Sequence, residues 1–239
     1  MITRIASEMR EHPSRWALGL LLVLMLAPVV FPSLDFAPSA WFYIPGAGFT
    51  WSADGFLEFV RAWVPDIIVG SFVVCVVLWI AGLWREQWPW RISTPRIVYL
   101  LLTLLIGPGL IVEALLKTEW GRARPKDIVM FGGEAAYTAP WQIAHECARN
   151  CSFASGHAAL AFWVTAYAFL LPPKWRATGL FAGVVFGLAV GLVRIVQGAH
   201  FLSDVAAAGF VVLLVNAALT RLILNRPALN RPVRNAAGA

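Results

Sequence analysis

Charged residues are scarce in this chain, and their scarcity limits what kind of protein it can be. Only 13% of the 239 residues are Asp, Glu, Lys or Arg, whereas 59% are hydrophobic. Soluble domains carry about 25% charged residues, so this composition excludes an ordinary cytosolic globule. The mean hydropathy of +0.71 indicates a surface that faces lipid, because a bilayer accepts apolar side chains that water does not.

Cysteine and histidine are also rare, with three and four copies. No second cysteine pair or histidine-rich segment accompanies His145, so we predict no metal site and no cofactor. Cys147 and Cys151 are close enough in sequence to form a small-loop disulfide on an oxidising side of a membrane, and the alternative is two free thiols. The chain lacks an internal repeat or a linker, which favours a single membrane-embedded domain over residues 1–239.

The formal net charge of +6 does not indicate a nucleic-acid-binding protein. The Lys and Arg residues are scattered instead of forming a basic stripe, and most of them flank apolar runs. Cations in that position are expected at helix ends that face anionic lipid head groups. We therefore predict a membrane partner and no nucleic acid.

Six apolar runs are long enough, or nearly so, to cross a bilayer, which takes about 20 residues. They predict an all-α polytopic membrane protein, a bundle of about six transmembrane helices. Small residues inside the fifth run, such as Gly183 and Gly187, would allow close helix packing. The runs cover Trp16–Phe31, Ile67–Trp84, Ile97–Leu116, Ala158–Leu171, Gly179–Val196 and Val205–Leu224.

The first run has two interpretations. Its Arg-bearing flank, apolar core and small residues at Ala37 and Ala40 resemble a signal peptide. Its apolar core is longer than that of most signal peptides, which favours a retained membrane anchor. Cleavage would leave the other five runs unchanged.

The distribution of Lys and Arg predicts which side of the membrane each connection occupies. The two termini, the second-to-third connection and the fourth-to-fifth connection must share a side, and they hold most of the cations: Arg4, Arg10, Arg15, Arg85, Arg91, Arg96, Lys174, Arg176, Arg221, Arg226, Arg231 and Arg234. The positive-inside rule places this side in the cytoplasm of a bacterial inner membrane. A second group of cations lies on the opposite, periplasmic side: Lys117, Arg122, Arg124, Lys126 and Arg194. Cations kept against the topological preference suggest that an anion binds there.

Reactive polar side chains gather in three segments at the edges of the apolar runs. The first segment carries Lys117 and Arg124, which can hold phosphate oxygens. The second segment is Ser155-Gly156-His157, just before the fourth run. Backbone N–H groups of Ser155 and Gly156 at a helix N-terminus would bind an anion, and His157 could donate a proton.

The third segment carries Arg194, His200 and Asp204. If a helix begins by His200, the imidazole and the Asp204 carboxylate lie on one face, and the carboxylate can orient the ring. A histidine backed by a carboxylate is arranged as a nucleophile or a base. Arg194 would join the phosphate-binding cations.

Purely structural roles compete with these assignments. They are an interfacial histidine for His157, a helix-stabilising pair for His200 and Asp204, and snorkelling to lipid head groups for Lys117 and Arg194. Arg122 and Lys126 lie beside the first segment, where they would contact a substrate head group or remain solvated charges.

At these residues the sequence resembles the type 2 phosphatidic acid phosphatase superfamily, the membrane relatives of the vanadium haloperoxidases. The pattern of that superfamily has three parts, all of which fall within residues 117–204. The matching residues are Lys117 and Arg124-Pro125, then Ser155-Gly156-His157, then Arg194, His200 and Asp204. Two positions depart from the pattern: Ala154 replaces a proline and Val193 replaces a serine.

The resemblance implies a metal-independent integral membrane lipid phosphatase with its site at the extracytoplasmic face. His200 would attack phosphorus to form a phosphohistidine, Asp204 would orient His200, and His157 would protonate the leaving group. The implied substrates are phosphorylated lipids such as lipid A, undecaprenyl pyrophosphate or phosphatidylglycerophosphate. The residues around Arg124 and His157 resemble those of the lipid A phosphatase group. The alternatives are a transporter that binds anionic lipid and a non-catalytic membrane protein.

Overall fold

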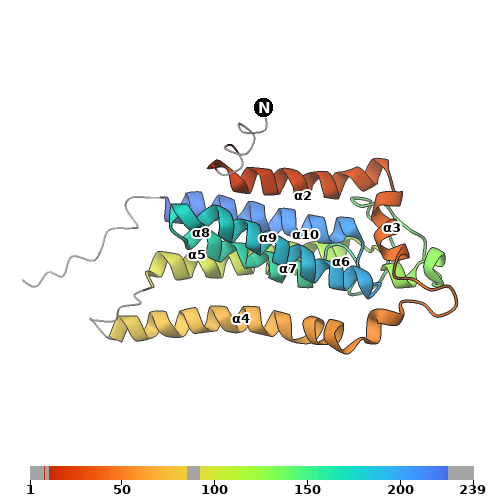
Figure 1. Cartoon of the computed structure of the whole chain (residues 1–239), viewed down its shortest axis with the longest axis horizontal. Helices are drawn as coiled ribbons and strands as arrows, with labels where there is room; N and C mark the ends of the chain where they lie inside the picture. The colour runs from red at the N-terminus through yellow and green to blue at the C-terminus, as the bar shows by residue number, and fades with distance from the viewer. Residues whose placement is uncertain (1–7, 9–10, 85–91, 226–239) are drawn as a thin grey trace, which may run out of the picture.

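The computed structural model describes Glu8 and residues 11–84 and 92–225, and within them the chain is helical without a β-strand. The long helices run side by side along one axis (Figure 1). Their bounds are α2 Pro13–Val30, α3 Ser33–Ala40, α4 Gly55–Trp84, α5 Thr94–Leu104, α6 Lys117–Glu119, α7 Gly156–Trp163, α8 Thr165–Leu170, α9 Pro173–Val196 and α10 Leu202–Leu219. A π-helical segment, Leu105–Leu116, joins α5 to α6, and another, Thr220–Leu224, follows α10.

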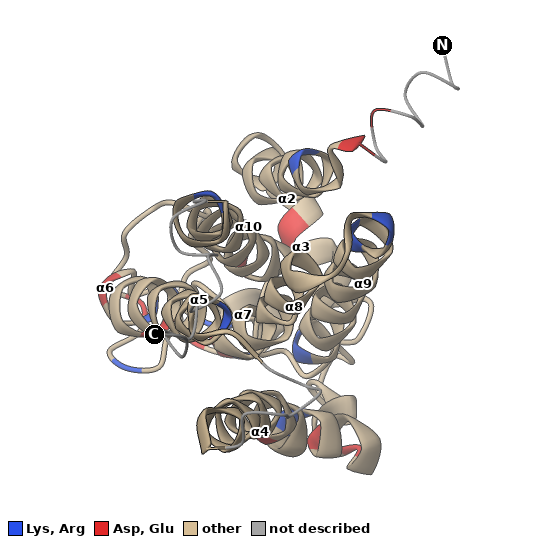
Figure 2. Ribbon diagram, turned by 90° about the vertical axis from the view of Figure 1, so that its left-hand side faces the viewer, with Lys and Arg blue, Asp and Glu red and all other residues tan. Residues whose placement is uncertain are grey.

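Five helices are long and apolar enough to cross a membrane, which confirms the prediction of a polytopic membrane protein. Their bounds are Pro13–Val30, Gly55–Trp84, Thr94–Glu119, Pro173–Val196 and Leu202–Leu224. The fourth predicted run forms the shorter pair α7 and α8, spanning Gly156–Leu170. This pair lies among the other helices in the end-on view (Figure 2). Because its neighbours surround it, it makes the sixth passage through the bundle with less apolar length than a lipid-facing helix needs.

Close approach between α9 and its neighbours depends on the small residues predicted for this purpose. A Cβ atom at Gly183 would lie 2.8 Å from Cγ2 of Thr165, and one at Gly187 would overlap the ring of Phe162. Buried hydrogen bonds join other helices of the bundle. Trp163 Nε1 on α7 donates to Thr103 Oγ1 on α5, and Asn216 Nδ2 on α10 donates to Thr165 Oγ1 on α8, both at 2.9 Å. Small residues and interhelical hydrogen bonds are what hold helices together in a bilayer.

The second transmembrane helix is longer than predicted. The sequence places its start at Ile67, where the uninterrupted apolar run begins, but α4 starts at Gly55. Its first turns are helical because Asp54 caps them through hydrogen bonds of 3.0 Å to the N–H groups of Phe56 and Leu57, and an ion pair links Arg61 to Glu58. A polar helical start can extend beyond the hydrocarbon layer, so hydropathy alone does not locate it.

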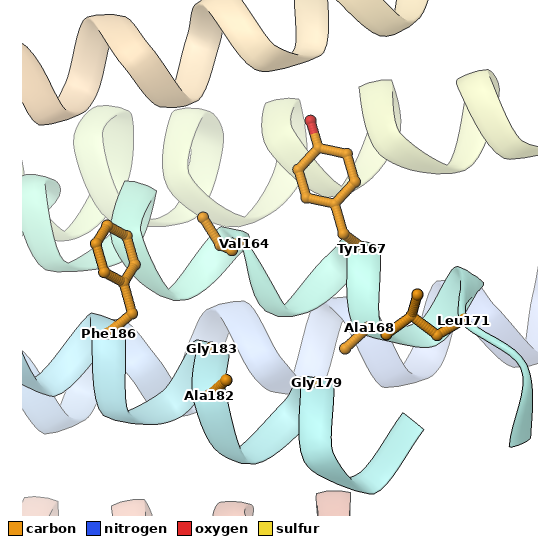
Figure 3. A pocket seen from close by; sticks show the side chains of 8 residues that line it. All are labelled: Val164, Tyr167, Ala168, Leu171, Gly179, Ala182, Gly183 and Phe186. Carbon is orange, nitrogen blue, oxygen red and sulfur yellow. The ribbon is translucent and has the colours of Figure 1, made fainter. Parts of the chain in front are cut away.

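An apolar cavity of about 330 Å³ lies between α8 and α9. Figure 3 shows its lining by Val164, Tyr167, Ala168, Leu171, Gly179, Ala182, Gly183 and Phe186. The connection between α8 and α9 lies at the end of the bundle opposite to α3 (Figure 1). The cavity includes Leu171 of this connection and shares no lining residue with the polar segments, which lie at the α3 end.

Candidate active site

The three polar segments meet at the end of the bundle where α6, the start of α7 and the turn between α9 and α10 come together (Figure 1). The backbone N–H of Ser155 donates to the carbonyl of Asp204 at 3.2 Å, which joins the second segment to the third. A Cβ atom at Gly156 would lie 3.4 Å from Nζ of Lys117, which joins the second segment to the first. The fold thus brings together residues that are far apart in sequence, as the resemblance implies.

His200 is held by a backbone carbonyl. Its Nδ1 atom lies 2.7 Å from the carbonyl oxygen of Ser152. A carbonyl only accepts hydrogen bonds, so Nδ1 carries the proton and Nε2 keeps its lone pair. Burial lowers the pKa of His200 below its ordinary value of 6.5, against the opposing effect of Asp204. The ring is therefore a neutral imidazole with Nε2 available for a new bond.

Asp204 orients His200 through Ser152, whereas the spacing predicted that the carboxylate itself could orient the ring. Helix α10 begins at Leu202, after His200, and the carboxylate lies 3.8 Å from Nδ1. Asp204 Oδ2 instead accepts hydrogen bonds from Ser152 Oγ at 2.5 Å and from the N–H of Phe201 at 2.8 Å. Asp204 thus fixes Ser152, and the carbonyl of Ser152 fixes the ring. Ser152 could not be identified from residue type, because it holds the ring through its backbone carbonyl.

Ser155 caps α7, and its hydroxyl accepts a 3.4 Å hydrogen bond from the N–H of Ala158. Its own N–H is engaged by Asp204, so it is not available for an anion as predicted. The next N–H groups, starting at Gly156, belong to the first helical turn, where no helix carbonyl can accept them. They and the helix dipole give the N-terminus of α7 the properties of an anion-binding site.

Lys117 is positioned beside that helix start by a carboxylate one turn earlier. Its Nζ atom lies 2.8 Å and 2.9 Å from the two oxygens of Glu113. The pair contacts the backbone at Gly156, where a Cβ atom would overlap Oε1 of Glu113. Glycine at this position therefore allows Lys117 to approach the start of α7.

We expect Gly156→Ala to weaken anion binding with little effect on stability. The added methyl group meets the flexible end of Glu113, so the side chain moves and takes Lys117 with it. Loss of one charge-assisted contact should raise the inhibition constant of inorganic phosphate about tenfold. The control is Gly70→Ala, since a Cβ atom there has no neighbour within 4 Å. Equal inhibition constants for the two variants would contradict this placement of Lys117.

A cavity of about 160 Å³ gathers two of the three predicted phosphate-binding cations. Its lining residues are Ser52, Glu58, Arg61, Arg124, Lys126, Arg194, Gln197 and Ala199. Arg124 donates to the carbonyl of Asn150 from Nε at 3.1 Å and Nη2 at 2.7 Å. Arg194 donates to Oε1 of Gln197 through Nη1, while its buried Nε has no hydrogen-bond partner among the described residues. Both guanidinium groups are held in place with donors left for an anion.

His157, half-buried near the start of α7, is within electrostatic reach of Arg194, His200 and Lys117. The backbone of Arg61 on α4 is a further neighbour of its ring. His157 therefore belongs to the same group of residues as the motif cations.

Arg122 takes neither of its two predicted roles, head-group contact or solvated charge, because its side chain is fully buried. Its guanidinium donates to Asp35 and Asp204, both at 2.5 Å, and lies 4.3 Å above the ring of Phe201. Lys126, by contrast, is exposed and lines the 160 Å³ cavity, where a head-group contact is open to it. Asp35 lies on α3, outside the three polar segments, so the motif spacings did not indicate it.

Cys147 and Cys151 form a disulfide, with a Cα–Cα distance of 5.6 Å. Both lie in the long connection between α6 and α7, which also supplies Asn150 to Arg124. Among the described residues, no cluster of three or more His, Cys, Asp or Glu side chains is arranged to hold a metal ion.

The structure is a helical membrane bundle with a histidine, an exposed helix start and fixed cations at one end, as expected for a membrane-embedded phosphatase. The PAP2 superfamily matches residues 96–227. The chain belongs to this superfamily. A protein named Lipid A 4'-phosphatase from Francisella tularensis subsp. novicida (strain U112) is 35% identical over 187 residues, covering 77% of this chain and 83% of that relative. One of the same name from Rhizobium leguminosarum is 38% identical over 120 residues, covering 50% of this chain and 52% of that relative. No solved structure matches the chain.

Proposed function

We propose that this protein removes a phosphate group from a lipid A-type glycolipid through a covalent phosphohistidine on His200. The observation that carries the proposal is the hydrogen bond from His200 Nδ1 to the carbonyl of Ser152, which leaves Nε2 unprotonated. The lipid substrate is proposed from the relatives named Lipid A 4'-phosphatase. The 4' position of the sugar is the corresponding proposal for the phosphate removed.

The reaction takes two steps in this proposal. The Nε2 lone pair of His200 attacks phosphorus, the bond from phosphorus to the sugar oxygen breaks, and His157 gives its proton to that oxygen. Water then attacks phosphorus while His157 takes up a proton, and the N–P bond breaks to release inorganic phosphate and neutral His200. Lys117, Arg124 and Arg194 would stabilise the charge on the phosphoryl oxygens in both steps.

The distribution of charge supports an extracytoplasmic site. Described cations at the opposite end of the bundle include Arg15, Arg96, Lys174, Arg176 and Arg221, as the positive-inside rule expects for the cytoplasmic side. Seven further cations that the same prediction covers lie outside the described residues: Arg4, Arg10, Arg85, Arg91, Arg226, Arg231 and Arg234. The disulfide near the site also favours an oxidising compartment such as the bacterial periplasm.

Access for a lipid is proposed from the side, beside α4. The N-terminal part of α4 supplies Glu58 and Arg61 to the cavity that contains Arg124 and Arg194. Only 11% of the most apolar window of α4 is buried, compared with 50% for α9. A phosphorylated lipid could therefore keep its acyl chains in the bilayer next to α4 while its phosphate reaches the cations.

The experiment that tests this proposal is phosphate release by the purified protein from a panel of lipids. We expect release from lipid A bisphosphate to exceed release from undecaprenyl pyrophosphate and phosphatidylglycerophosphate, and EDTA to leave the rate unchanged. Mass spectrometry of the product would identify the sugar position. Binding of lipid A without turnover would instead identify a lipid-binding protein, and loss of activity in EDTA would contradict the metal-independent mechanism.

A further inference from the structure

A cluster of three charged groups is buried directly behind the reactive histidine. Arg122 lies between Asp35 and Asp204, with 2.5 Å from Nη2 to Asp35 Oδ2 and 2.5 Å from Nη1 to Asp204 Oδ1. All three side chains are 0% exposed. Buried charges are costly unless they are paired and hydrogen-bonded, so such a cluster needs many partners.

Asp35 has those partners on both of its oxygens. Oδ1 accepts the N–H of Ser203 at 2.8 Å, and Oδ2 accepts the hydroxyl of Ser203 at 3.0 Å and that of Tyr137 at 3.2 Å. Arg122 is further fixed by the carbonyl of Thr138, 3.0 Å from its Nε atom. Asp35 is therefore bound to the first turn of α10, the turn that also carries Asp204.

Asp35 comes from a part of the chain that the PAP2 superfamily match does not include. It lies on α3, which packs against α10 at the site end of the bundle (Figure 1), whereas the match covers residues 96–227. None of the motif spacings points to this residue. The N-terminal segment thus contributes a charged group to the interior of the site.

The charges of the cluster do not cancel. Two carboxylates and one guanidinium leave a net charge of minus one, and the carboxylate nearer to the site is 3.8 Å from Nδ1 of His200. In the proposed reaction the His200 ring becomes cationic when Nε2 bonds to phosphorus, because Nδ1 keeps its proton. A negative charge fixed behind the ring stabilises that form more than the neutral ring.

We propose that Asp35 is a positioning residue for catalysis, which acts through Arg122 and Asp204 on His200. Asp35 holds Arg122 so that Asp204 keeps its contacts with Ser152, and it supplies the net negative charge that favours the phosphohistidine. This inference rests on the proposed phosphohistidine mechanism. Asp35 does not touch the substrate, so its removal should affect the chemical step and leave substrate binding nearly unchanged.

The test is Asp35→Asn, which keeps the shape of the side chain and removes its charge. We expect kcat to fall about tenfold to a hundredfold, as for other groups that support a reactive residue from behind. KM should stay within about threefold, because uniform binding is unaffected. Rapid-quench measurement of the phosphoenzyme should place the loss in its formation. An unchanged kcat, or a raised KM with unchanged kcat, would overturn the inference.

Matched variants separate this role from general stability. Glu134→Gln removes an exposed carboxylate in the connection between α6 and α7 and should keep wild-type kinetics. Tyr137→Phe removes one hydrogen bond to Asp35 without changing the charge of the cluster, so its kcat should fall much less than that of Asp35→Asn. Equal losses in Tyr137→Phe and Asp35→Asn would contradict the role of the charge.

A second variant covers the case in which Asp35→Asn does not accumulate in the membrane. Arg122→Lys keeps the positive charge but cannot bridge two carboxylates, so it tests the positioning of Asp204 alone: kcat should fall while KM stays within about threefold. Rates are measured with p-nitrophenyl phosphate, so that they do not depend on the identity of the lipid. Failure of the wild type to act on lipid A would overturn the proposed substrate and leave this comparison intact.

Discussion

The variant His200→Ala is expected to lose phosphate release almost completely, by about four orders of magnitude or more. The N–P bond cannot form without Nε2 of His200. This histidine follows Ala199, which lines the cavity that contains Arg124 and Arg194. Initial rates of phosphate release from lipid A bisphosphate provide the measurement. The protein should still bind phosphate, because the cations and the start of α7 remain in place.

The matched control for His200→Ala is His145→Ala. His145 is exposed in the connection between α6 and α7 and takes no part in the site, so this variant should keep the wild-type rate. A residual rate above about 1% in His200→Ala would contradict nucleophilic catalysis by this residue, since removing a nucleophile typically costs far more.

The second large effect is expected for His157→Ala, and its size should depend on the leaving group. A sugar alkoxide needs a proton to depart, so the rate with lipid A should fall about 10²-fold to 10⁴-fold. The p-nitrophenolate ion leaves without a proton. The single-turnover release of p-nitrophenol should therefore stay within about threefold of the wild-type rate.

Single-turnover stopped-flow absorbance distinguishes this role from a simple effect on structure. If His157 also activates water in the second step, His157→Ala should release one equivalent of p-nitrophenol rapidly and then turn over slowly. Equal losses with both substrates would show that His157 does not protonate the leaving group. The measurement thus separates proton transfer from the positioning of phosphate, which would affect both substrates alike.

The helical bundle was largely predictable because long apolar runs leave few alternatives in a chain with so few charges. The prediction was wrong at the start of α4, which begins before the uninterrupted apolar run. Helix α4 extends to Gly55 because Asp54 caps its first turn. The fourth apolar run was short in the sequence, and the α7 and α8 pair that it forms lies among the other helices (Figure 2).

The proximity of the candidate site residues was easier to predict than their contacts. His200 and Asp204 lie 3.8 Å apart, yet the direct partner of the ring is the carbonyl of Ser152. Backbone partners leave no mark on residue type, so a pattern of side chains cannot indicate them. Arg122 and Asp35 were misjudged or missed for another reason. Their ion pair joins positions far apart in the chain, and only the packing of α3 on α10 brings them into contact.

The most direct test of the proposed mechanism is to trap the phosphorylated enzyme. Protein quenched in alkali during turnover of radiolabelled lipid A, then digested, should carry an acid-labile phosphate on the peptide that contains His200. His200→Ala should abolish the trapped phosphate. Phosphate found on another residue, or active turnover without any covalent phosphate, would contradict a phosphohistidine at His200.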